Sequence, residues 1–314
     1  MAQAPELSRR IAAFPGGGIK GYACALWLEA LEARLGCPLG DRIGLAAGTS
    51  TGAILACAVG SKIPAARIAR LYREHGPAIF TSGLGWLWSR LRRTLSAGLS
   101  APLYDSGPLA SALVAEFGPE APLSGLPVPT LLTAYFAGAK CPGLHVMKSW
   151  RYVASSPYTW QAVLGSCAAP GYFPAVGNGL VDGGLAANDP SVCAIAEALR
   201  LDPGASPRDL ALISVSAGRP PDPLPTAKLQ AWGFAQWAPH ILTRVFHGQE
   251  SATAYAVDQL LAPERRVRTA IALESGALDD ASPANLDGMQ LAVMRHLDSE
   301  AGEAEMRQAL ALIA

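Results

Sequence analysis

The stretch Gly48-Thr49-Ser50-Thr51-Gly52 places a serine between two glycines, where one apolar run, residues 43–47, gives way to another, residues 53–59. The first run is predicted to be a strand and the second a helix, so Ser50 stands at a strand-to-helix turn. Such a turn crowds its neighbours against both elements, and the flanking positions must therefore lack a Cβ. Gly48 and Gly52 meet that need, and the helix aims its first amide groups at Ser50. The pattern predicts Ser50 as a nucleophile; taken alone, it fits a plain tight turn equally well.

Length and composition bound the class of protein. At 314 residues with 50% hydrophobic content the chain can bury a large core, and we expect a single domain over residues 1–314. Its core is expected at about 11–275 and a terminal helix at about 284–313. The 25 basic and 25 acidic residues give zero formal net charge, so no global field recruits a nucleic-acid polymer. The six cysteines are scattered through apolar stretches, which is typical of reduced thiols in a cytoplasmic protein; neither metal nor cofactor is expected.

A second glycine motif follows the first predicted strand, residues 11–14. It reads Gly16-Gly17-Gly18-Ile19-Lys20-Gly21 and leads into a predicted helix that ends before Gly36. The spacing matches a dinucleotide-binding loop, whose ribose ligand should stand at the end of the next strand. Asp41 has the required spacing but precedes that strand. The nucleotide interpretation is therefore disfavoured.

The glycine loop suits a different task better, namely holding a developing negative charge. Three consecutive glycines, Gly16, Gly17 and Gly18, expose backbone N–H groups, and the amide of Thr51 after the candidate nucleophile adds a further donor. Lys20 either anchors this loop or is a solvated surface lysine. The sequence thus predicts an oxyanion hole beside Ser50.

The candidate base is Asp182, in Leu180-Val181-Asp182-Gly183-Gly184. It ends a run over residues 152–181 that lacks charge but holds several prolines and glycines, which indicates irregular backbone lining an apolar cleft. A carboxylate at a strand end, with glycines after it, is placed as a catalytic base would be. An isolated Asp-Gly can also be a simple turn. We expect the apolar run to raise the pKa of Asp182 by desolvation.

Two further stretches suit a membrane surface or the body of the protein. Residues 80–100 mix tryptophans and leucines with arginines and hold no acidic residue, which indicates either a lipid contact or an amphipathic helix packed on the domain. Residues 226–249 are aromatic with little charge and are predicted to form a lid or a second membrane contact. The candidate lipid-contact residues of the first stretch are Trp86, Trp88, Arg90, Arg92 and Arg93.

A glycine loop, a Gly-x-Ser-x-Gly turn and an Asp-Gly-Gly motif in this order resemble the patatin-like phospholipases, from about Ile11 to Ser216. The resemblance implies an α/β fold of three layers, with a mostly parallel central sheet flanked by helices, and hydrolysis of acyl esters in lipids. It implies Ser50 and Asp182 as a catalytic dyad and the glycine loop as the oxyanion hole. The residues supporting these motifs are Lys20, Gly21, Gly48, Gly52, Gly183 and Gly184.

Three departures from the family pattern leave substrate choice open. Lys20 stands where arginine is commoner, Ala53 follows the turn where a glycine is frequent, and Asn188-Asp189-Pro190 replaces a pair of asparagines before proline. Lipid hydrolases of this compact kind include antiphage effectors switched on by cyclic oligonucleotides. We therefore expect a regulated bacterial effector with a cyclic nucleotide activator, cytoplasmic and peripheral to the inner face of the membrane when active. No motif identifies the nucleotide site.

Two other functions compete with this interpretation. An ordinary α/β-hydrolase would use a Ser-Asp-His triad, for which His240, His247 and His296 follow the acid in the expected chain order. A non-catalytic lipid-binding module of the same fold would lose the serine or the aspartate. Both are present here, which favours catalysis.

Overall fold

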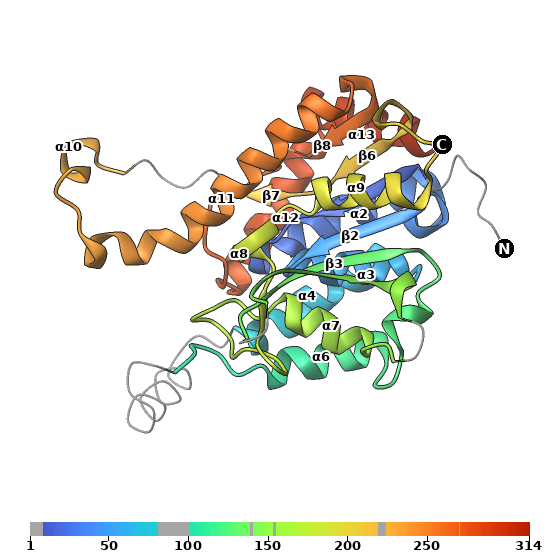
Figure 1. The fold of residues 1–314 in the computed structure, drawn as a ribbon. Helices are drawn as coiled ribbons and strands as arrows, with labels where there is room; N and C mark the ends of the chain where they lie inside the picture. Colours follow the sequence, from blue (N-terminus) through green and yellow to red (C-terminus); the bar gives the residue numbers. More distant parts are fainter. Residues whose placement is uncertain (1–8, 81–100, 139–140, 153–154, 219–223, 270) are drawn as a thin grey trace.

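The computed structural model describes residues 9–80, 101–138, 141–152, 155–218, 224–269 and 271–314, and its centre is a mostly parallel sheet (Figure 1). The strands lie in the order β4-β3-β2-β1-β6-β8. Within it β1, β2, β3, β6 and β8 run parallel, whereas β4 and β5 pair antiparallel with β3. The bounds are β1 Arg10–Phe14, β2 Leu45–Thr49, β3 Thr130–Phe136, β4 Gly143–Lys148, β5 Leu180–Asp182, β6 Ala211–Ser214 and β8 Arg266–Arg268, with a separate pair β7 Ala217–Gly218 and β9 Ile271–Ala272.

Side chains that alternate along the strands feed two cores. In β1, Ala12 and Phe14 belong to the larger core, whereas Ile11 and Ala13 belong to the smaller one. All four are at most 1% exposed, as expected for a parallel strand covered on both faces. The strand at 11–14 predicted from its apolar run is confirmed.

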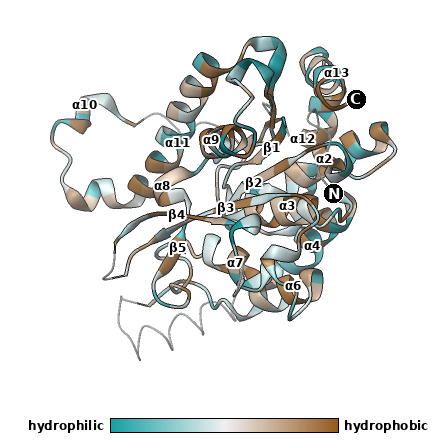
Figure 2. Ribbon diagram, turned by 45° about the vertical axis from the view of Figure 1, so that its right-hand side comes forward, coloured by the Kyte–Doolittle hydropathy of each residue, from teal (hydrophilic) through white to brown (hydrophobic). Residues whose placement is uncertain are grey.

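Helices cover both faces of the sheet (Figures 1 and 2). The larger core is built with α2, α3, α4, α6, α7, α12 and α13, and the smaller with α9 and α11. The three-layer architecture expected from the sequence is confirmed. The helices span α2 Gly21–Leu35, α3 Thr51–Gly60, α4 Ala65–Ile79, α6 Gly107–Phe117, α7 Thr159–Ser166, α8 Gly184–Ala187, α9 Ser191–Leu201, α10 Thr226–Leu229, α11 Phe234–Leu260, α12 Pro283–Leu297 and α13 Glu300–Ile313.

One edge of β3 is shared by β2 and β5, and this sharing positions the site. The first part of β3 pairs with β2, up to Thr49 opposite Thr133. The last part pairs with β5, beginning with Asp182 opposite Ala134. Because β2 runs parallel to β3 and β5 antiparallel, their carboxyl ends meet along that edge. Ser50, the residue after β2, is thereby brought beside Asp182.

The structure corrects some expected elements. The uncharged residues 43–61 form β2 and α3, and no helix in the described residues has the length and apolar character needed to cross a bilayer. The single terminal helix expected at 284–313 is wrong: it is two helices, because the Ser299 side chain caps α13 by accepting a hydrogen bond from the Gly302 amide, 3.0 Å away. The run 152–181, expected to be irregular, contains α7. The candidate lipid-contact residues lie outside the described residues; they are Trp86, Trp88, Arg90, Arg92 and Arg93.

Candidate active site

The serine turn has the strained backbone that its sequence predicts. Ser50 adopts φ 54° and ψ −127°, a conformation that residues with a side chain rarely take. A Cβ at Gly48 would collide with the Gly52 carbonyl, and a Cβ at Gly52 would collide with the carbonyl of Phe14. Both glycines are therefore needed for the close approach of α3 to the sheet. The turn presents Ser50 at the N-cap of α3, directly before its first residue Thr51, where helix N–H groups are unpaired.

Ser166, at the end of α7, holds this turn in place. Its Oγ accepts a hydrogen bond from the Ser50 amide at 2.9 Å and donates one to the Thr133 carbonyl at 2.6 Å. Ser166 thus links the serine turn to β3, the strand with which β5 also pairs. Sequence reasoning missed Ser166, since a serine ending an uncharged helix carries no signal of its own.

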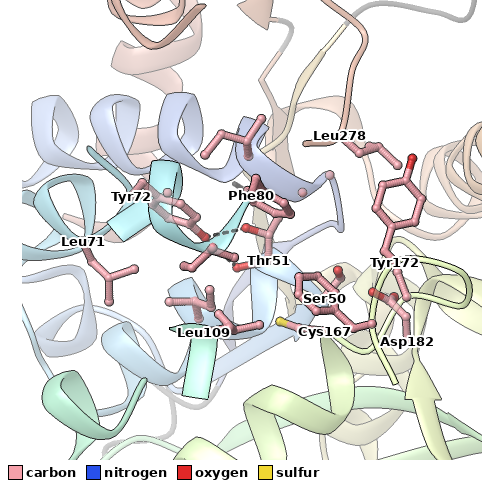
Figure 3. Close-up of a pocket in the computed structure, with 18 of the residues that line it drawn as sticks. Ser50, Thr51, Leu71, Tyr72, Phe80, Leu109, Cys167, Tyr172, Asp182 and Leu278 are labelled. Carbon is pink, nitrogen blue, oxygen red and sulfur yellow. Dashed lines mark hydrogen bonds between the residues drawn. The ribbon is translucent and has the colours of Figure 1, made fainter. Parts of the chain in front are cut away.

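Asp182 is buried, with a side chain that faces the serine turn (Figure 3). Its Oδ1 accepts a hydrogen bond from the Gly184 amide at 2.7 Å. Burial raises the pKa of Asp182 from 3.8 to about 6, whereas the Ser50 hydroxyl and the Gly184 amide lower it. Oδ2 is buried and has no hydrogen-bond partner among the described residues, although the Ser50 hydroxyl is near enough to lower the pKa of the carboxyl. Catalytic hydrogen bonds of this kind commonly tighten only when substrate is bound.

The glycine loop runs past the same turn. Gly18 has φ 60°, and its α-carbon lies so close to the Leu278 carbonyl that no side chain would fit. That carbonyl also accepts a hydrogen bond from Ile19 at 2.8 Å, which fixes the loop from the C-terminal part of the chain. Leu278 was not identified from the sequence, because the contact joins positions far apart in the chain.

Three backbone amides near Ser50 are free to donate hydrogen bonds to an anion. The N–H groups of Gly17, Gly18 and Thr51 donate no hydrogen bond to any described residue. Gly16 differs from the expectation, because its N–H already donates to the Asn188 carbonyl at 2.9 Å. Gly16 therefore supports the loop and offers no free donor.

Ser50, Asp182 and the three free-amide residues line one pocket, whose remaining walls are largely apolar (Figure 3). Tyr72 forms part of the wall, and its hydroxyl donates to the Thr51 carbonyl at 3.0 Å, so it also fixes the start of α3. A carboxyl in such surroundings is desolvated, which accounts for its raised pKa. The other apolar and aromatic lining residues include Ile54, Leu71, Ile79, Phe80, Leu109, Tyr172, Phe173, Phe246 and Leu278.

Helix α11 is joined to the glycine loop through a buried polar network. The side-chain Nδ2 of Asn188 donates a hydrogen bond to Glu250 Oε1 at 2.7 Å, and the backbone N–H of Asn188 donates one to Gln249 Oε1 at 2.9 Å. The backbone carbonyl of Asn188 also accepts the hydrogen bond from the Gly16 N–H described above. Burial lowers the pKa of Lys20, and the charge of Glu250 opposes that shift, so Lys20 is a partly buried lysine and not a fully solvated one.

None of the five histidines lines this pocket. His240 stacks on Trp232 with ring centroids 5.4 Å apart, and His296 pairs with Glu305 at 2.8 Å. His247 is exposed on α11. The site therefore brings Ser50 together with a carboxyl and no imidazole.

A mostly parallel sheet that carries a glycine-bounded serine on a strained strand-to-helix turn defines the α/β class of serine hydrolase folds. The model of the patatin-like phospholipase family matches residues 12–191, which include the glycine loop, the serine turn and Asp182. The chain belongs to the patatin-like phospholipase family. This membership confirms the family expected from the three motifs.

Two bacterial relatives are similar over most of the chain. A cUMP-AMP-activated phospholipase of Escherichia coli is 32% identical over 231 residues, covering 69% of this chain and 67% of the relative. A cGAMP-activated phospholipase of Pseudomonas aeruginosa is 28% identical over 272 residues, covering 80% of this chain and 75% of the relative. Among solved structures, the type III effector protein ExoU matches at 16% identity with a TM-score of 0.42, covering 96% of this chain and 53% of ExoU.

Proposed function

We propose that this protein is a lipid acyl hydrolase that cleaves acyl ester bonds of membrane phospholipids with Ser50 and Asp182 as a dyad. The observation that carries the proposal is the buried Asp182 carboxyl, which faces Ser50 in an apolar pocket and has a pKa raised to about 6. An ordinary aspartate is a weak base at neutral pH, and a higher pKa brings it nearer the value that proton transfer requires. The apolar walls suit an acyl chain.

Each group has a defined role in this mechanism. Ser50 Oγ attacks the acyl carbonyl carbon while its proton passes to Asp182. The oxyanion that forms accepts hydrogen bonds from the free amides of Gly17, Gly18 and Thr51. When the intermediate collapses, Asp182 returns the proton to the leaving alcohol, and the acyl group remains on Ser50. Water, deprotonated by Asp182, then attacks the acyl-enzyme. The second intermediate collapses by breaking the bond between the acyl carbon and Ser50 Oγ, which takes the proton back from Asp182, and the fatty acid is released.

The dyad is tested by substitution in the purified protein, with phosphatidylglycerol and phosphatidylethanolamine vesicles as substrate and mass spectrometry of released fatty acids and lysolipids. Ser50→Ala and Asp182→Asn are expected to abolish hydrolysis, since each removes a group that acts in every turnover. The His240→Gln, His247→Gln and His296→Gln variants serve as controls. They should stay within about tenfold of the parent, roughly 1.4 kcal/mol in the barrier.

Circular dichroism of every variant separates loss of chemistry from loss of fold. A folded histidine variant as inactive as Ser50→Ala would show that the mechanism uses a Ser-Asp-His triad and not a dyad. A folded Asp182→Asn variant with full activity would remove Asp182 from the mechanism.

We further propose that the activity is regulated by a cyclic nucleotide and that the protein acts as a bacterial effector against its own cell membrane. The support is the similarity to two relatives whose names state activation by cUMP-AMP and by cGAMP. Both similarities extend over at least 67% of either chain, so they include more than the catalytic motifs. A phospholipase active inside the cell that makes it needs such control.

The regulation is tested by measuring phospholipid hydrolysis across a panel of cyclic di- and trinucleotides that includes cUMP-AMP and cGAMP. One member is expected to raise the rate at least tenfold, with linear dinucleotides of the same bases as matched controls. Steady hydrolysis that no member of the panel changes would contradict regulation, although it would leave the dyad standing.

A further inference from the structure

Helix α10 and the first turns of α11 extend away from the rest of the described chain (Figure 1). We refer to residues 224–245 as the arm. Within the arm, the ring centroids of Trp232 and Trp237 are 5.7 Å apart in an edge-on contact, and Gln236 accepts a hydrogen bond from the Gly233 amide at 3.0 Å. Both contacts join residues of the arm to one another.

The arm exposes a stripe of large apolar side chains to solvent. Phe234 is 84% exposed, Ile241 48% and Val245 40%. Together with Trp237, which is partly buried, they follow one another at spacings of three and four residues, so the four lie on one face of α11. Exposed apolar side chains gathered on one helix face mark a surface that meets another apolar phase. We refer to these four residues as the stripe.

The charge of the arm indicates which partner it fits. Between residues 224 and 249 the sequence holds Lys228 and Arg244 and no aspartate or glutamate. Aromatic rings with basic residues and no acid suit the headgroup region of an anionic bilayer. A second copy of this chain fits less well, because symmetric pairing would bring the same cations together.

Resting on the function proposed above, we propose that the arm docks on an anionic lipid surface, with the stripe inserted into the headgroup region. The same helix reaches the pocket one residue after the stripe, because Phe246 lines the wall beside Ser50 and packs against Gly184. Docking therefore places the pocket at the bilayer surface. An acyl chain then passes from the bilayer into the apolar pocket with little exposure to water.

The test uses the full chain with Ser50→Ala, so that vesicles stay intact, and measures flotation with phosphatidylcholine vesicles that hold or lack phosphatidylglycerol. The variant Phe234→Ser/Ile241→Ser/Val245→Ser is expected to reduce binding to the anionic vesicles at least tenfold. Leu291→Ser/Met294→Ser on α12 is the matched control, since these side chains are 47% and 54% exposed but lie outside the arm. The control should bind like the parent. The parent should bind the anionic vesicles several-fold better than the neutral ones.

A second measurement uses the chain with Ser50 intact and a soluble short-chain ester. The stripe variant should hydrolyse this ester within about twofold of the parent, because its three substituted residues do not line the pocket, yet lose activity on vesicles. Undiminished vesicle binding by the stripe variant would overturn the proposal. So would a parent that binds no vesicle but forms a dimer that the stripe variant loses. If no chain hydrolyses any ester while the stripe governs vesicle binding, the catalytic proposal fails and the docking surface stands.

Discussion

At the scale of single residues, burial changes the chemistry of Asp182, the carboxyl that we propose as the base. Asp182 is 1% exposed, and burial is the largest influence on its pKa. The one hydrogen bond to its Oδ1 comes from a backbone amide that cannot give up a proton. Among the described residues of the pocket, Ser50 and Cys167 lie near this carboxyl, and burial raises the pKa of the Cys167 thiol well above its ordinary value.

The raised pKa of Asp182 predicts the pH dependence of hydrolysis. The base must be ionised, so kcat/KM should be low at pH 4 to 5, rise through about pH 6 and level off above pH 7. The measurement is kcat/KM against a soluble short-chain ester across this range. A rise centred near pH 4 would mean that burial does not perturb the carboxyl.

At the scale of elements, the sequence predicted best what a local pattern controls. The serine turn, the strand before it and the helix after it follow from two glycines and two apolar runs, and Gly36 ends α2 with φ 69° as expected. Ser166 and Leu278 escaped prediction, because each supports the site through a hydrogen bond from a residue more than 100 positions away. Asn188 appeared in the sequence only as a departure from a motif. Its contacts to α11 and the glycine loop exist only in the folded chain.

The glycine loop allows a matched pair of substitutions. Gly18 and Gly36 both have positive φ, but only Gly18 is packed against another backbone, the Leu278 carbonyl. Gly36→Ala is expected to cost about 1 kcal/mol of stability through its left-handed backbone and to leave activity unchanged. Gly18→Ala adds a collision that displaces the loop, and should lower kcat at least a hundredfold, the usual effect of losing an oxyanion donor.

Thermal unfolding and ester hydrolysis of the two variants check this pair. Equal activities in two folded proteins would show that the amides near Gly18 do not hold the oxyanion.

At the scale of the whole molecule, the two hydrophobic cores cover both faces of the sheet, and the site lies at the edge of the larger core. Burying an ionisable group there has a cost for folding. A carboxyl whose pKa is about 6 when folded and 3.8 when unfolded binds more protons in the folded state between these values. Its contribution to stability is therefore full below pH 4 and is lost as the pH rises through 6.

Asp182→Asn removes this loss. The variant should exceed the parent in free energy of unfolding by roughly 3 kcal/mol above pH 7, since each pKa unit is worth about 1.4 kcal/mol, and by little near pH 4. Denaturant titrations at the two pH values measure the difference. A stability gain that is equal at both would indicate a packing effect of the amide and not relief of a buried charge.

The shared edge of β3 also governs when a newly made chain brings Ser50 and Asp182 together. Ser50 and Asp182 are 132 positions apart (182 − 50), and they meet only after β2 and β5 have both paired with β3. A nascent chain on the ribosome exposes the sequences of the serine turn and the glycine loop early, because synthesis runs from the N-terminus, whereas the contacts of Asn188 and Leu278 that fix the loop form later. The proposed base joins Ser50 only after residue 182 has emerged and β5 has paired with β3. If Ser50 and Asp182 act as the proposed dyad, a nascent chain therefore has no hydrolytic activity before β5 takes its place in the sheet.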